Sequence, residues 1–229
     1  MKITYLGQAG LLFEIGDMKI MFDPYLSDSV EKIQPQNRRR VPVDQRFLQM
    51  LPDVLVCTHN HLDHTDPDTL KHYLNQTQKE ITVLAPEAAW QTVRKFGGIH
   101  NYVRFNRHTE WTLGNVRLRA VLAEHSDPHP IGVLLEAERK TYYVTGDTLY
   151  NSDLFEDVPI GVDAVFLPVN GKGNNMNMAD ARRFCERIRP KVAVPIHCGL
   201  FDDVDPTIWD YPNKVIAEYY QEIKLEELK

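Results

Sequence analysis

The chain has 229 residues, of which 43% are hydrophobic and 25% are charged, so we expect one globular domain that spans residues 1–229 and has a substantial apolar core. The net charge of -6 does not favour binding to the phosphate backbone of nucleic acid. No stretch is long enough to span a bilayer, and three cysteines without a CxxC pair suit free thiols in a reducing cytoplasm. We therefore expect a cytoplasmic protein.

The first part of the chain carries β signals. Short β-prone runs lie at residues 2–6, 11–15 and 18–22. Their alternating apolar residues and intervening glycines are unlike a signal peptide, and residues 15–18 predict a hairpin turn.

Residues 24–45 differ from the runs before them. They contain three prolines and few apolar residues, which predicts a long loop. The consecutive arginines Arg38, Arg39 and Arg40 would form a basic lid, a contact between subunits of a homo-oligomer, or only a solvated surface.

Two strand–helix units follow this loop. Residues 54–57 predict a buried strand, and Asp66 and Pro67 then predict a capped helix that ends near Leu74. Residues 81–85 predict the next strand, followed by a helix from Pro86 to the glycines at 97–98.

The second half repeats this order. β patterning returns at residues 116–122, 131–135, 141–145 and 164–167, a helix is predicted at 178–188, and a strand at 192–196. A final helix is predicted from Pro212, because Val215, Ile216, Tyr219 and Ile223 share one helical face. Two halves of this kind predict an α/β fold in which two mixed sheets pack face to face with helices outside.

Residues 59–64 read HNHLDH and directly follow the strand at 54–57. His59 and His61 are two apart, so both side chains point the same way on an extended backbone. Asp63 and His64 follow as the chain turns. Four ligands this close suit two metal ions a few ångströms apart better than one tetrahedral site, and a closed structural zinc site would more often include cysteine.

Further candidate ligands follow other strands. His125 lies in AEHSD, Asp147 in TGDT and His197 in PIHCG. A single histidine at a strand end is more often a hydrogen-bonded structural residue, and Asp147 also fits an Asx turn. Together the set offers seven nitrogen and oxygen donors, which suits two divalent ions of zinc or manganese, with iron also compatible.

The HxHxDH spacing, the later histidine, the GDT aspartate and the final histidine resemble the metallo-β-lactamase superfamily over nearly the whole chain. The resemblance implies a four-layer αβ/βα sandwich. It implies a first metal on His59, His61 and His125, a second on Asp63, His64 and His197, and Asp147 as the bridge between them. Asp23, in MFDPYL, would support the metal-binding loop without touching a metal.

Four stretches look most like the L-ascorbate-6-phosphate lactonase-like branch of that superfamily. They are AEHSDPHPIGVLLE, YYVTGDTLY, FLPVNGKGNNMNMADA and VAVPIHCGLF. This resemblance implies a lactonase-like enzyme of the ester-hydrolase class.

The chemistry expected of such a site is hydrolysis. Two metals make an activated hydroxide available near neutral pH, and Asp63 would orient it and take its proton as the catalytic residue. Asn170 and Lys172 follow the strand at 164–167 and are candidate substrate contacts, with Asn175 and Asn177 as weaker candidates. Lys172 would meet an anionic group, although a solvated loop lysine explains it equally well.

Three functions remain open from the sequence. The first is hydrolysis of a small, anionic ester or lactone, such as a sugar-phosphate lactone. The second is a phosphodiesterase or nuclease of the same fold. The third is a non-catalytic metal-binding protein whose metal shell is closed to substrate.

Overall fold

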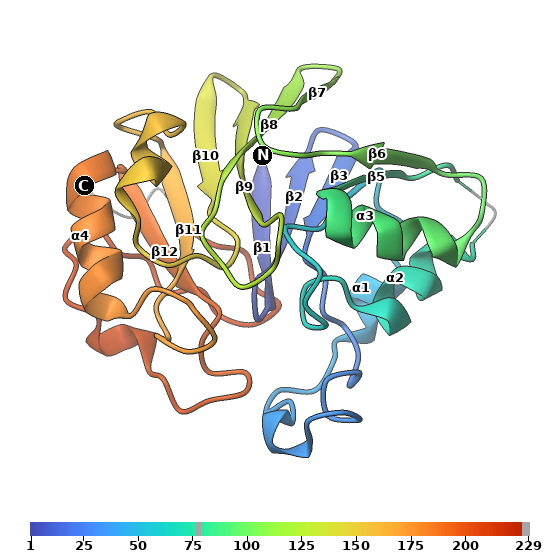
Figure 1. Ribbon diagram of the computed structural model, residues 1–229, viewed down its shortest axis with the longest axis horizontal. Helices are drawn as coiled ribbons and strands as arrows, with labels where there is room; N and C mark the ends of the chain where they lie inside the picture. The colour runs from blue at the N-terminus through green and yellow to red at the C-terminus, as the bar shows by residue number, and fades with distance from the viewer. Residues whose placement is uncertain (77–78, 226–229) are drawn as a thin grey trace.

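The computed structural model describes residues 1–76 and 79–225 (Figure 1). Two six-stranded mixed sheets pack face to face, in the strand orders β1-β2-β3-β4-β5-β6 and β12-β11-β10-β9-β8-β7. Helices α1, α2 and α3 lie on one outer side of the pair and α4 on the other (Figure 1). This is the four-layer sandwich that the order of predicted elements indicates.

The elements of the first sheet are β1 (Lys2–Gly7), β2 (Gly10–Ile15), β3 (Met18–Phe22), β4 (Val54–Val56), β5 (Thr82–Ala85) and β6 (Asn101–Arg104), with helices α1 (Gln45–Leu48), α2 (Pro67–Leu74) and α3 (Glu87–Val93). Those of the second sheet are β7 (Glu110–Leu113), β8 (Val116–Leu122), β9 (Ile131–Ala137), β10 (Lys140–Val144), β11 (Ala164–Pro168) and β12 (Val192–Ile196), with helix α4 (Met178–Ile188). Short 3-10 turns lie at Pro35–Asn37, Arg94–Phe96, Ser152–Glu156 and Pro206–Ile208.

Strand direction decides which loops meet. β3 to β6 are parallel to one another, and β1 runs in the same direction as β3 because both are antiparallel to β2. In the second sheet β10, β11 and β12 are parallel, and β8 shares their direction because both β8 and β10 are antiparallel to β9. Since the carboxyl ends of parallel strands lie at one edge, the segments after these strands are brought together by each sheet.

The core between the sheets is aromatic at its centre. Phe13 of β2 is fully buried. Its ring lies 5.4 Å from Phe22, 5.9 Å from Tyr142 and 5.8 Å from Phe166, each in an edge-to-face arrangement. Two of these partners belong to the second sheet, so Phe13 holds the two sheets against each other.

The helix ends that were predicted from capping residues are confirmed for α2 and α3. Asp66 caps α2 by accepting a hydrogen bond from the backbone N–H of Asp68, with Pro67 in the first turn. Pro86 precedes α3, and its 3-10 extension ends at Gly97, whose φ of 79° suits glycine. The hairpin turn between Ile15 and Met18 is also present.

The predicted C-terminal helix is wrong. The described residues after Pro212 run irregularly, pairing Lys214 with Ala193 of β12 and Glu222 with Thr4 of β1. β12 and β1 are the edge strands of the two sheets, whose unpaired backbone groups need partners. The segment supplies them, and Ile223 packs into the core between the sheets. Its four-residue apolar spacing therefore reflects contacts with the sheets, not a helical face.

The loop at residues 24–45 is long, as predicted, apart from its 3-10 turn and the start of α1 at Gln45. Arg39 is buried, and its guanidinium donates to the carbonyl oxygen of Tyr25 and to the hydroxyl of Tyr220, both at 2.7 Å. Arg39 therefore fastens the loop to the C-terminal segment and belongs to no mobile lid. Arg40 pairs with Asp203, and Arg38 is largely exposed.

We predict that Phe13→Ala lowers the free energy of unfolding by about 3–5 kcal/mol, because it leaves a cavity where the two sheets meet. Urea denaturation followed by circular dichroism measures the loss. Ile99→Ala is the control, since Ile99 is 88% exposed and its change is expected to stay within about 0.5 kcal/mol. Equal effects of the two substitutions would contradict the assigned role of Phe13.

Candidate metal centre

The seven residues predicted as ligands lie together at the edge where the strand ends of both sheets meet. The loop after β4 supplies His59, His61, Asp63 and His64, and the segments after β8, β10 and β12 supply His125, Asp147 and His197. Three groups of three within this set have candidate ligand atoms within 4.8 Å of one another: His59, His61 and His125; His59, His64 and Asp147; and Asp63, His64 and His197.

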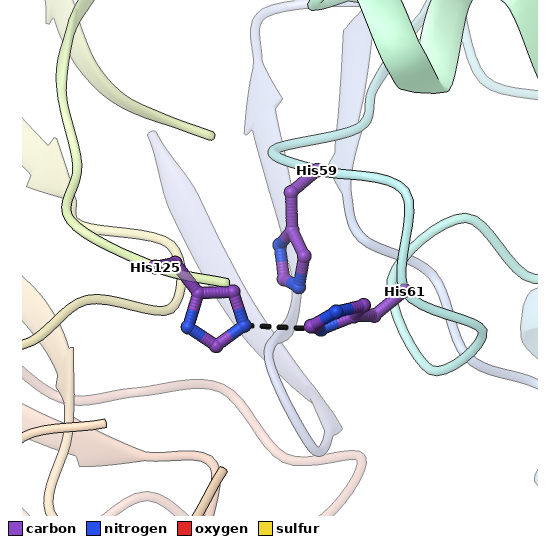
Figure 2. A group of neighbouring side chains, drawn as sticks. All are labelled: His59, His61 and His125. Atoms are coloured by element: carbon purple, nitrogen blue, oxygen red, sulfur yellow. Dashed lines mark hydrogen bonds between the residues drawn. The ribbon is translucent and has the colours of Figure 1, made fainter. Parts of the chain in front are cut away.

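The first group is formed by three histidines whose rings point toward one another (Figure 2). The ring centroids of His59 and His61 lie 4.6 Å apart, and those of His61 and His125 lie 4.8 Å apart. Nε2 of His125 is 3.0 Å from Nδ1 of His61. His125 comes from the second sheet and the other two from the first, so this group forms only in the folded sandwich.

The third group joins the carboxylate of Asp63 to the imidazoles of His64 and His197. Oδ2 of Asp63 lies 3.3 Å from Nε2 of His197 and 3.7 Å from Nε2 of His64. The rings of His64 and His197 are stacked, with centroids 5.2 Å apart. Their Nε2 atoms and the Asp63 oxygen thus face a common point.

Asp147 contacts both the first and the third group. Its Oδ2 is 3.1 Å from Nε2 of His197 and 3.7 Å from Nε2 of His125, and its Oδ1 is 3.3 Å from Nε2 of His64. The Asn175 side-chain amide donates to the same Oδ2 at 2.9 Å. This carboxylate therefore contacts histidines of both sets.

Asp23, at the end of β3, fixes the loop that carries the first four candidates. Its carboxylate accepts hydrogen bonds from the Thr58 backbone N–H at 2.7 Å and from the Thr58 hydroxyl at 2.6 Å. It also contacts Nδ1 of His64 at 2.8 Å. Since a carboxylate only accepts, Nδ1 of His64 carries a proton and its Nε2 is directed at the cluster.

The same network orients His59. The Thr58 hydroxyl has one proton and donates it to Asp23, so its contact with Nδ1 of His59 at 3.1 Å is one in which Nδ1 donates. Nε2 of His59 is then unprotonated and also directed at the cluster. Asp23 therefore lies beneath the loop, where it contacts Thr58 and Nδ1 of His64. Among the described contacts of Asp23, none is to a ligand atom that faces the cluster.

Three buried atoms in the cluster have no hydrogen-bond partner within the described part of the chain: Nε2 of His59, Nε2 of His64 and Oδ1 of Asp147. Leaving such atoms unpaired in a folded protein is costly. A divalent cation accepts lone pairs from imidazole nitrogen and carboxylate oxygen. The residues present therefore fit a metal.

At this site the effects of burial and of neighbouring charges on the pKa values oppose each other. Burial alone would lower the pKa of His197, but the carboxylates of Asp147 and Asp63 outweigh burial and raise the pKa to about 10. Burial is likewise opposed at His64, whose pKa the same carboxylates raise well above its usual range. Burial favours the neutral form of Asp63, yet His64 and His197 hold the pKa of Asp63 below its ordinary value.

The predicted substrate contacts divide three ways. Lys172 lines the pocket beside the cluster. Asn170 lines it too, and its amide lies 3.2 Å from Nδ1 of His197, where it supports that ring. Asn177 has a different role from the predicted one: its side-chain oxygen caps α4 by accepting from Ala179 and Asp180, and it does not line this pocket.

Asn175, a weaker substrate-contact candidate, donates to Oδ2 of Asp147. The sequence analysis does not identify Gln8, which lies just after β1 and donates to Oδ2 of Asp63 at 2.8 Å. Gln8 is a polar residue directly after a predicted strand, which is the signal that identified His125 and Asp147.

A pocket of about 440 Å³ opens beside the cluster. Asp63, Asp147, His61 and His197 line it, together with residues of the loop at 30–37. The volume is in the range of small-molecule sites.

No helix in the described residues is both long and apolar enough to cross a membrane.

A family model and curated relatives match most of this chain. A family model described as "Beta-lactamase superfamily domain" matches residues 18–198. A UPF0173 protein of Pyrococcus furiosus is 28% identical over 207 residues, covering 90% of this chain and 87% of the relative. A UPF0173 metal-dependent hydrolase of Carboxydothermus hydrogenoformans is 27% identical over 222 residues, covering 93% and 92%.

Solved structures share the fold. Igni18, a metallo hydrolase from Ignicoccus hospitalis, superposes with a TM-score of 0.73 at 20% identity, over 96% of each chain. The metallo-beta-lactamase fold protein YhfI from Bacillus subtilis gives 0.72 at 16% identity, over 96% of this chain and 97% of its own.

We predict that zinc binding to the metal-free protein releases protons near neutral pH. The raised pKa of His197, about 10 against an ordinary 6.5, and the raised pKa of His64 mean that both imidazoles hold an extra proton there, which a metal must displace. Affinity should therefore increase as pH rises from about 6 to 8. Calorimetry in two buffers of different ionisation enthalpy measures the release. Identical heats in both buffers would contradict this reading.

Proposed function

The chain belongs to the beta-lactamase superfamily, and from that membership and the geometry of its site we propose that it is a metal-dependent hydrolase. We propose further that it uses two divalent ions, zinc or manganese, and acts on a small, anionic ester or lactone. The observation that carries the proposal is the convergence of Nε2 of His59, Nε2 of His64 and Oδ1 of Asp147. These atoms are buried and have no hydrogen-bond partner in the described part of the chain, and the candidate ligand atoms of these residues lie within 4.8 Å of one another.

The proposed ligand sets follow the contacts. His59, His61 and His125 would hold the first ion, and Asp63, His64 and His197 the second, with Asp147 between them. Two bound ions of this kind supply a water of lowered pKa and polarise a substrate carbonyl or phosphoryl oxygen.

Asp63 is the proposed catalytic residue. Its side chain is 20% exposed whereas that of Asp147 is 5% exposed, so Asp63 is the more accessible of the two carboxylates from the pocket. The neighbouring imidazoles of His64 and His197 lower its pKa, so the carboxylate is ionised near neutral pH. Asp63 would orient the attacking water and accept its proton.

The pocket supports a substrate with an anionic group. Lys172 is the cationic side chain among the described residues that line it, and an ammonium group binds phosphate or carboxylate as a point charge. Asn37 and Asn174 add neutral polar groups to the lining, and Ile33 and Phe201 add apolar ones. This mixture suits a small polar molecule with an apolar part.

An open pocket against Asp63 and His197 favours an enzyme over a metal-binding protein whose metals are enclosed. The net charge of -6 gives no support to a nuclease. The related proteins named metal-dependent hydrolases agree with the proposed reaction class.

We predict that protein purified without added metal contains close to two equivalents of zinc or manganese by elemental analysis, and that it hydrolyses lactones or esters faster than bis-ester phosphates. His61→Ala should lower turnover by about 100-fold or more, as loss of a metal ligand does. His72→Ala is the control, since His72 lies on α2 and bonds the Leu48 carbonyl oxygen. Full turnover by His61→Ala would reject the proposal, and faster cleavage of a bis-ester phosphate would favour a phosphodiesterase.

We predict that Lys172→Ala raises KM for an anionic substrate by about tenfold, a loss of roughly 1.4 kcal/mol, and leaves kcat nearly unchanged. The reason is that Lys172 lies on the pocket wall and contacts no candidate ligand. Steady-state kinetics on matched anionic and neutral substrates measure the effect, with the exposed Lys95→Ala as control. An equal KM change for both substrates would contradict charge recognition by Lys172.

A further inference from the structure

Gln8 is a buried residue of the site to which neither the sequence motifs nor the family resemblance assigns a role. It follows β1 and is 3% exposed. Its amide nitrogen donates to Oδ2 of Asp63 at 2.8 Å and lies 3.0 Å from Nε2 of His197. One neutral side chain therefore contacts the carboxylate from the first sheet and the imidazole from the second.

The backbone of Gln8 is also fixed to the site. Its carbonyl oxygen accepts a hydrogen bond from the backbone N–H of His197 at 2.7 Å and one from the Tyr5 hydroxyl at 2.9 Å. These bonds tie the turn after β1 to the turn after β12. The Gln8 amide is thus held at a defined place relative to the ring of His197.

Gln8 has a φ of 52°, in the left-handed region that glycine adopts without cost. A residue with a side chain is strained in this region. Two other site residues, Asp23 and His197, share this conformation with φ of 40° and 56°. Non-glycine residues held in this region often have a functional reason, and for Gln8 the contacts of its side chain supply one.

We infer that Gln8 is a positioning residue that selectively strengthens the second proposed metal position. By holding Oδ2 of Asp63 in place, its amide reduces the ordering that this carboxylate must undergo when it binds a cation. An amide does not titrate, so this support is present at every working pH. The inference rests on the proposed two-metal function.

The first metal position provides an internal comparison. Nδ1 of His59 contacts Thr58, and Nδ1 of His125 contacts the carbonyl oxygen of Asn174. Within the described residues, the side-chain amide of Gln8 contacts Asp63 and His197 and none of the three histidines of the first group. Loss of the Gln8 amide should therefore weaken one position and spare the other.

The test is zinc binding to Gln8→Gly and Gln8→Asn, prepared free of metal by chelation. Both replacements tolerate a positive φ, so both are expected to fold. Glycine removes the amide, and asparagine keeps one that is a methylene too short. Zinc is titrated by calorimetry, and its retention is measured by dialysis against graded chelator. Gln34→Ala is the matched control, because Gln34 lines the same pocket without contacting a candidate ligand.

The expected result is that the wild type and Gln34→Ala bind two equivalents, and that both Gln8 variants bind the second equivalent about 10–100-fold more weakly with the first unchanged. Wild-type affinity for both equivalents in the variants would overturn the inference and leave the proposed function intact. Equal weakening of both equivalents would also overturn it, since that indicates a general structural role. Fewer than two equivalents in the wild type would instead refute the two-metal proposal.

Discussion

The hydrogen bonds to the buried carboxylate of Asp23 are the interaction on which the site depends. This group accepts from the backbone and hydroxyl of Thr58 and from Nδ1 of His64, which satisfies a charge that would otherwise be costly to bury. Through Thr58 it also sets the proton of His59. Both histidines must then present Nε2 to the same point. The unpaired nitrogen atoms of the cluster are thus a consequence of one carboxylate beneath the loop.

The direction of the strands brings the other candidate ligands together. Because β4, β8, β10 and β12 each deliver their carboxyl ends to the shared edge, ligands distant in the chain meet without a dedicated loop to carry them. The aromatic contacts of Phe13 with Tyr142 and Phe166 hold the two sheets against each other. Damage to this core would separate His125 from His61, so packing and metal binding are expected to be coupled.

The sequence predicts most of the fold and the proposed ligands because both are encoded locally. The cluster at 59–64 and the polar residues after buried strands are short-range patterns, and the structure brings them together. The C-terminal segment was misread because an apolar four-residue spacing fits a helix as well as two sheet edges, and only the folded sandwich shows which edges need partners. Arg39 and Gln8 could not be assigned for a similar reason, since their partners Tyr220 and His197 are far away in the chain.

The central claim is that the seven side chains hold two ions bridged by Asp147. The most direct measurement is anomalous diffraction from crystals of zinc- or manganese-loaded protein, recorded on both sides of the metal absorption edge. The account predicts two peaks about 3.5–4 Å apart. One peak should contact His59, His61 and His125 and the other Asp63, His64 and His197, with Asp147 contacting both. A single peak, or peaks that leave Asp147 unbound, would contradict it.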